Sequence, residues 1–69
     1  MRRGLAIKLR RIELEKKTIN VAASVGISRE YLRLIEAGKA KNPSIGVMKK
    51  LADELQSDVQ VLFFNYDEE

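Results

Sequence analysis

The sequence of 69 residues contains no cysteine and no histidine. Without cysteine, the chain cannot form a disulfide or a thiolate metal site. Without histidine, it lacks a principal zinc ligand and the most common general base of enzymes. We therefore expect no catalytic site, no metal, no cofactor and no small-molecule ligand.

Long apolar runs are also missing. No run approaches the roughly 20 residues of a transmembrane helix, and the basic start of the chain leads into an amphipathic segment, unlike a signal peptide. We expect a cytoplasmic protein with no membrane partner. Its hydrophobic fraction of 45% and its length fit a single folded domain with one modest core. We place this domain at residues 1–66 and a short acidic tail at residues 67–69.

Charge is distributed unevenly along the chain. Residues 1–17 carry seven basic and two acidic side chains, and residues 18–50 carry six and two. Residues 51–69 carry six acidic side chains and no basic ones. A basic body suggests a polyanionic partner, although a solvated basic surface explains the charge equally well.

Apolar residues recur at intervals of three and four, which predicts an all-α fold of five helices. The first helix is expected at residues 4–17. It has apolar side chains on two sides, as is typical of a central helix in a small bundle. They are Leu5, Leu9 and Ile12 on one side, and Ile7 and Leu14 on the other.

The other four helices are predicted from residues that begin or end helices. Side chains able to cap a helix start are Thr18, Ser28, Ser44 and Asp58. Gly26 can end the second helix in the left-handed conformation. Residues 59–64, VQVLFF, could form a strand by β-propensity, but their apolar spacing after Asp58 favours a helical turn.

The second and third predicted helices meet at a tight corner, Gly26-Ile27-Ser28, and form a helix-turn-helix. The second helix of such a unit enters the major groove of DNA. Arg29 and Arg33 share a face and can each donate two hydrogen bonds to a guanine.

The sequence leaves two alternative roles for each of two neighbouring residues, Glu30 and Tyr31. Glu30 can accept a hydrogen bond from cytosine, or pair with Arg33 three residues later. Tyr31 can contact a thymine methyl group or a phosphate, or act as a wedge against the first helix. Ser28 and the helix start can present N–H groups to a phosphate.

Over about residues 5–63, the chain resembles the phage repressor and Cro-type (XRE-like) helix-turn-helix family. The matching residues are AASVGIS at 22–28, Leu32, IEAGK at 35–39, NPS at 42–44, Leu51-Ala52, Leu55 and Leu62-Phe63. The resemblance implies a compact lambda-repressor-like domain of five helices. It also implies a homodimer that binds a palindromic operator in double-stranded DNA.

The resemblance implies roles by position. Base-reading residues are implied at Arg29, Glu30, Arg33 and Leu34. Contacts with the DNA backbone are implied at Thr18, Lys39, Lys41 and Asn42. A structural salt bridge between the first and third helices is implied for Arg11 and Glu36.

The sequence departs from the family pattern in three places. Thr18 stands where many members have a longer glutamine that contacts phosphate, and Leu34 occupies a position that is often polar. Lys16 replaces a usual leucine, and Ile19 replaces a usual polar residue. We expect Ile19 to fill the space left by Lys16, and we expect Lys8, Lys16 and Lys17 to be plain surface residues.

Apolar side chains near the carboxyl end exceed what a small core can bury. If Val59, Leu62 and Phe63 face inward, the excess residues are Val61, Phe64 and Tyr66. An exposed apolar patch usually marks an interface, so a homodimer is predicted, with a tail folded back on its own domain as the alternative.

The sequence thus predicts a sequence-specific regulator of transcription, a repressor on an inverted-repeat operator. A protein-interaction module of the same fold, such as an antitoxin, is the alternative. The small size fits phage or mobile-element switches and restriction–modification controllers equally well.

Overall fold

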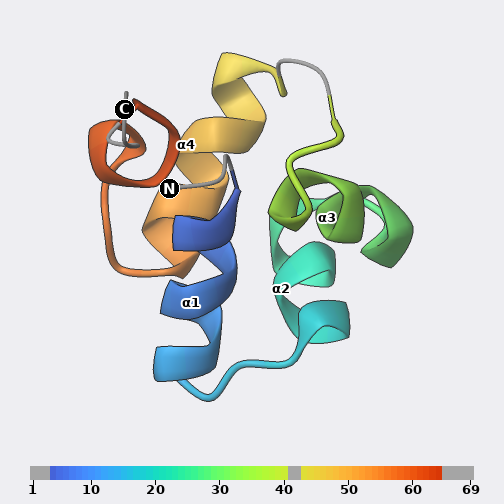
Figure 1. Ribbon diagram of the computed structural model, residues 1–69. Helices are drawn as coiled ribbons and strands as arrows, with labels where there is room; N and C mark the ends of the chain where they lie inside the picture. Colours follow the sequence, from blue (N-terminus) through green and yellow to red (C-terminus); the bar gives the residue numbers. More distant parts are fainter. Residues whose placement is uncertain (1–3, 41–42, 65–69) are drawn as a thin grey trace.

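The computed structural model describes residues 4–40 and 43–64, which form four α-helices and one π-helical turn (Figure 1). The elements are α1 (Leu5–Glu13), α2 (Thr18–Val25), α3 (Arg29–Glu36), α4 (Ile45–Glu54) and η1 (Gln60–Phe64). The predicted all-α fold with five helical elements is therefore confirmed. Within the described ranges, no helix is long and apolar enough to cross a membrane. Lys41, Asn42, Tyr66 and the acidic tail at 67–69 lie outside these ranges.

Three of the four predicted helix caps are present. The cap oxygens accept backbone N–H bonds as follows: Ser28 Oγ from Tyr31 at 3.0 Å, Ser44 Oγ from Val47 at 3.2 Å, and Asp58 Oδ1 from Val61 at 2.9 Å. The fourth prediction, Thr18, was wrong. Thr18 is the first residue of α2, and Lys17 occupies the cap position without a side-chain hydrogen bond.

The first helix is shorter than the sequence pattern predicted. It ends at Glu13, and Glu15 has a φ of 57° in the left-handed region, which helices do not continue through. The prediction of two buried apolar sides was also wrong. Ile7 is fully buried, whereas Leu9 and Ile12 are 50% and 51% exposed.

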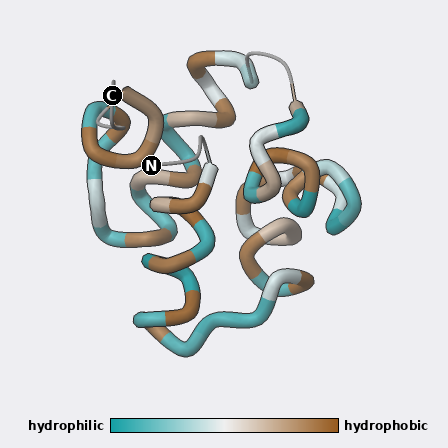
Figure 2. Tube along the Cα trace, in the orientation of Figure 1, coloured by the Kyte–Doolittle hydropathy of each residue, from teal (hydrophilic) through white to brown (hydrophobic). Residues whose placement is uncertain are grey.

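The core draws on every element, and hydrophobic and hydrophilic residues alternate along each helix (Figure 2). Its buried members are Ile7, Val21, Ala22, Val25, Leu32, Ile35, Leu51, Ala52, Leu55 and Leu62. Val59 and Phe63 pack against its edge, so the predicted inner face of the last helical segment is confirmed. α1 packs against α3 and η1, while α2 packs against α3 and α4.

The corner between α2 and α3 is built as predicted. Gly26 has a φ of 86°, a conformation that costs other residues energy, and its N–H donates to the carbonyl of Ala22 at 2.9 Å. Ile27 packs against the core behind the corner. The turn therefore fixes the direction in which α3 leaves α2.

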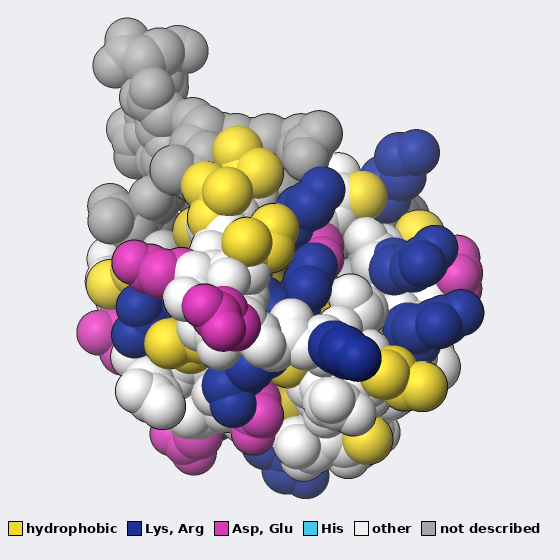
Figure 3. All heavy atoms as spheres, turned by 90° about the horizontal axis from the view of Figure 1, so that it is seen from below, with side chains coloured by type: hydrophobic (Ala, Val, Ile, Leu, Met, Phe, Trp, Pro, Cys, Tyr) yellow, Lys and Arg dark blue, Asp and Glu magenta, His cyan; other side chains and the backbone are white. Residues whose placement is uncertain are grey.

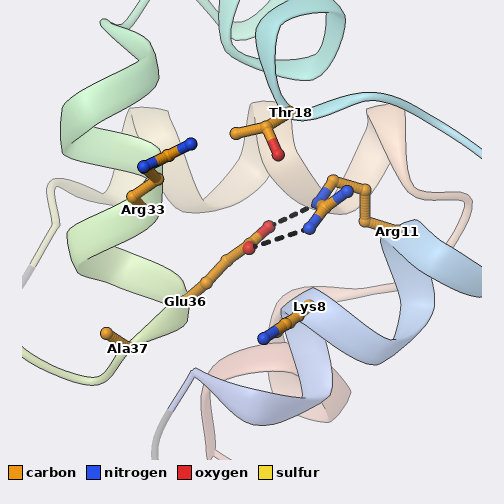
Figure 4. Close-up of a pocket in the computed structure, with 6 residues that line it drawn as sticks. All are labelled: Lys8, Arg11, Thr18, Arg33, Glu36 and Ala37. Carbon is orange, nitrogen blue, oxygen red and sulfur yellow. Dashed lines mark hydrogen bonds and ion pairs between the residues drawn. The ribbon is translucent and has the colours of Figure 1, made fainter.

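Arg11 joins α1 to the end of α3. Its Nε and Nη2 atoms donate to the two carboxylate oxygens of Glu36 at 2.7 and 3.1 Å (Figure 4). This is the ion pair that the family resemblance implied, and the Glu36 side chain is only 7% exposed. Arg11 Nη1 also donates to the carbonyl of Lys16 at 3.0 Å, so one guanidinium fixes both α3 and the loop before α2.

The preceding residue, Arg10, holds a different element. Its Nε donates to the carbonyl of Leu55 at 2.9 Å, and its Nη2 donates to the carbonyl of Gln56 at 3.1 Å. These carbonyls lie at the carboxyl end of α4, where helix carbonyls lack partners within the helix. Two adjacent arginines of α1 therefore hold α3 and α4.

A further ion pair corrects two predictions about the loop before α2. Lys16, expected to be a plain surface residue, is partly buried and donates from Nζ to Glu54 Oε2 of α4 at 3.1 Å. Ile19, expected to fill the space beside it, is 55% exposed. The Lys16 side chain is 31% exposed, as expected of a lysine whose apolar stem can pack while its ammonium group pairs.

Gly4 provides a stability test of the contact between α1 and α3. Gly4 has a φ of 90°, and an added Cβ would collide with the carbonyl oxygen of Ile35 and lie 2.8 Å from that of Glu36. We expect Gly4→Ala to lower the free energy of unfolding by about 1–3 kcal/mol in a urea titration. Gly46→Ala is the control, because its Cβ meets only Ser44 Oγ at 3.8 Å. Gly46→Ala should raise the free energy of unfolding by about 0.5–1 kcal/mol. An equal change in the free energy of unfolding for both variants would contradict the close contact between Gly4 and the end of α3.

The Arg11–Glu36 pair provides a second test. Glu36→Gln keeps the shape but removes the charge, which leaves a largely buried guanidinium without its counter-ion. We expect a loss of about 3 kcal/mol in the free energy of unfolding, at the lower end for a buried pair because Arg11 is still 13% exposed. Glu13→Gln removes a 68%-exposed partner of Arg10 and should cost less than about 1 kcal/mol. A similar loss in the free energy of unfolding for both variants would show that the buried pair stabilises the fold no more than the exposed pair does.

Candidate nucleic-acid interface

The third helix has one buried side and one open side. Its buried residues are Leu32, Ile35 and Glu36, and its exposed residues are Arg29, Glu30, Arg33 and Leu34. The four exposed residues are those to which the resemblance assigned base reading. The packing of the opposite side therefore presents these side chains to solvent as a group.

Tyr31 is the exception among the predicted base-reading residues. It is half-buried and packs against the edge of the core. This packing is a structural contact, and the contact of Tyr31 with a thymine methyl group or a phosphate stays a prediction. Helical geometry explains the difference, since Tyr31 lies on the same side of α3 as Leu32 and Ile35.

Glu30 keeps its carboxylate open on the exposed side. Among the ion pairs formed within residues 4–40 and 43–64, none involves Glu30, Arg29 or Arg33. The alternative use of Glu30, a pair with Arg33, is thus not formed in this structure. Within the part of the chain that the structure describes, these three charged groups are exposed and form no ion pair.

A shallow basic groove of about 380 Å³ runs between the start of α2 and α3. It is lined by Arg11, Lys16, Lys17, Thr18, Ile19, Arg29 and Arg33. Seen from below, basic side chains gather on the side of α2 and α3, and most acidic ones lie on the other side (Figure 3). The groove therefore presents a positive surface beside the open side of α3.

The predicted backbone contacts are spread around the ends of α2 and α3. Ser28 is exposed at the start of α3, and Lys39 is exposed shortly after its end. Thr18 stands at the start of α2 and lines the basic groove. Ser28 and Lys39 therefore lie just beyond the two ends of α3, and Thr18 lies in the groove beside it.

A second cleft, of about 270 Å³, lies between α1, α2 and α3 (Figure 4). Its lining residues are Lys8, Arg11, Thr18, Arg33, Glu36 and Ala37. Arg33 points from α3 across this cleft toward Thr18 and Arg11 (Figure 4). Lys8 was expected to be a plain surface residue. It is exposed, and it also lines this cleft, three residues before Arg11 on the same side of the helix.

The predicted interface residues near the carboxyl end are exposed where the structure describes them. Val61 is 43% exposed and Phe64 is 54% exposed on η1. Leu9 and Ile12 are exposed on α1, which packs against η1. Within the described ranges, no cluster of three or more acidic side chains could hold a metal ion.

Comparisons with known proteins agree with this geometry. A family model described as helix-turn-helix matches residues 7–62. SinR of Bacillus subtilis, a regulator of biofilm formation solved in complex with DNA, is 32% identical over 86% of this chain and 94% of that chain, with a TM-score of 0.78. The restriction–modification controller protein C.AhdI from Aeromonas hydrophila is 27% identical over 87% of this chain and 89% of that chain, with a TM-score of 0.78.

The phage P22 c2 repressor, solved with a synthetic operator, shows the same fold. It has a TM-score of 0.87 and 21% identity over 96% of this chain and 98% of that chain. A comparison with curated proteins found no significant match. Because the family model covers most of the chain, the chain belongs to the helix-turn-helix (XRE-type) family of DNA-binding transcriptional regulators.

Proposed function

We propose that this protein binds a specific double-stranded DNA sequence through α3 and represses transcription as a homodimer on an inverted-repeat operator. The observation that carries the proposal is the two-sided nature of α3. Its inner side is fixed by Leu32, Ile35 and the Glu36 ion pair. Its outer side carries Arg29, Glu30 and Arg33, which form no ion pair with other described residues. A helix of this diameter fits the major groove, which is about 12 Å wide.

Three residues on the outer side are suited to distinguish bases. Arg29, in the first turn, can donate two hydrogen bonds to the O6 and N7 atoms of guanine. Glu30 can accept from the amino group of cytosine, and it repels phosphate, which disfavours misplaced binding. Leu34 is 37% exposed and can contact a thymine methyl group.

The surroundings of α3 support binding across the DNA backbone. The basic groove of about 380 Å³ adjoins α3. Ser28 and Lys39 lie just beyond the two ends of α3. Backbone contacts of this kind set the position of the protein and supply most of the salt-dependent affinity. SinR, which is similar in sequence to this chain, was solved in complex with DNA.

The homodimer is supported by apolar surface that the domain leaves open. Val61 and Phe64 of η1 are large and about half exposed. A two-fold pairing through η1 would bury them and present two copies of α3 to successive major grooves, about 34 Å apart. An inverted-repeat operator matches this symmetry.

The proposal is tested first by selecting bound sites from a pool of random duplexes. We expect one enriched sequence with two inverted half-sites. Its affinity should fall steeply with salt and exceed that for random DNA by at least about 10³-fold. A wild-type protein with no sequence preference would contradict the proposal and favour the protein-interaction module of the same fold.

Arg29→Ala tests base reading on the selected site. We expect a loss of about 1–3 kcal/mol in binding free energy and a relaxed preference at one base pair of each half-site. Lys39→Ala is the comparison, because a backbone contact should weaken selected and random duplexes equally. The assignment of roles fails if both variants change affinity and specificity in the same way.

Phe64→Asp tests the interface. A carboxylate in an apolar patch must be desolvated on pairing, so the variant should sediment as a monomer and bind a single half-site about as well as the complete operator. The wild-type protein should sediment as a dimer under the same conditions. An unchanged mass for the variant would remove Phe64 from the interface, and circular dichroism would verify that it folds.

A further inference from the structure

We infer that the cleft between α1, α2 and α3 receives one backbone phosphate of the bound DNA, and that Lys8 and Arg33 supply its charge. The inference rests on the proposed function and extends the DNA-contacting surface beyond the helix-turn-helix to α1. It also gives Arg33 a different role from the base reading predicted from sequence.

The charge of the cleft is the first argument. Lys8, Arg11 and Arg33 line it together with one carboxylate, that of Glu36. Both oxygens of this carboxylate are taken by Arg11, at 2.7 and 3.1 Å. Among the ion pairs within residues 4–40 and 43–64, none involves Lys8 or Arg33, so the cleft holds two positive charges in excess.

The arrangement of hydrogen-bond donors is the second argument. Lys8 comes from α1 and Arg33 from α3, on different walls of the cleft (Figure 4). Thr18 contributes a hydroxyl from the first turn of α2, where backbone N–H groups also carry partial positive charge. Donors that converge from three elements suit a tetrahedral oxyanion with several acceptor oxygens, as in a phosphate group.

The position of Arg33 is the third argument. It lines both the cleft and the basic groove, and it points toward Thr18 rather than straight out from α3 (Figure 4). It therefore lies at the edge of the open side of α3, where that side meets α2. A guanidinium in this position is directed at the backbone beside the major groove, and Arg29 remains the arginine suited to bases.

The cleft is continuous with the basic groove, and this continuity favours a phosphate of the DNA backbone as its ligand. The cleft shares Arg11, Thr18 and Arg33 with the basic groove that borders α3. A duplex that follows this groove would carry a phosphate past the mouth of the cleft. Free inorganic phosphate has the same chemistry, so the experiment must distinguish the two sources.

Substitutions that remove one charge give the first test, on the duplex selected from the random pool. We expect Lys8→Gln and Arg33→Gln each to weaken selected and random duplexes equally and leave their affinity ratio unchanged. Each should also lower the salt slope by about one, so that the loss of affinity between 50 and 200 mM salt shrinks about threefold. Lys49→Gln is the matched control, because Lys49 is exposed on α4 beside Asp53 and Asp58, and it should change nothing.

Neutral methylphosphonates placed at single backbone positions of the selected duplex give the second test. One position in each half-site should weaken wild-type binding and have no effect on Lys8→Gln. Equal sensitivity of both proteins at every position would overturn the inference, as would a relaxed base preference in Arg33→Gln. If inorganic phosphate shifts the NMR signal of Thr18 but no methylphosphonate position is sensitive, the assignment to a DNA phosphate is overturned. None of these results affects the proposed function, which fails only if the wild-type protein has no sequence preference.

Discussion

The buried ion pair between Arg11 and Glu36 is the constraint on which the orientation of α3 depends. A carboxylate with 7% exposure at the end of a helix is stable only where its partner meets it in good geometry. The two-pronged contact with Arg11 meets this requirement in one position of α3 relative to α1. The close approach of Gly4 to the carbonyls of Ile35 and Glu36 admits no larger residue at that point. The direction in which α3 faces solvent follows from these contacts.

Local chemistry made much of the fold predictable from sequence. Ser28, Ser44 and Asp58 cap helices through bonds to residues three positions later, and Gly26 forms the corner by its own conformation. Such features depend on near neighbours, so they can be recognised in the sequence. The ion pair between Arg11 and Glu36 joins residues far apart in the chain, and it was expected only because the sequence resembles a family in which such a pair occurs.

Features set by packing between distant segments were not predictable. Apolar spacing alone gave no means of telling that Leu9 and Ile12 face solvent, because η1 and α3 cover other sides of α1. The pairing of Lys16 with Glu54 depends on how the loop before α2 meets α4. In the interface, composition and spacing indicated the open side of α3, whereas the direction of Arg33 and the place of Lys8 became visible only once α1, α2 and α3 were assembled.

The adjacent arginines Arg10 and Arg11 have a consequence for the kind of operator the protein can use. One turn of α1 fixes α3 through Glu36 and the end of α4, just before η1, through Leu55 and Gln56. If two copies pair through η1, the separation and relative rotation of their reading helices are thereby set by a rigid frame. One base pair inserted between half-sites would turn one of them by about 35° about the duplex axis. The protein would then discriminate between operators by the distance between their half-sites as strictly as by their base sequence.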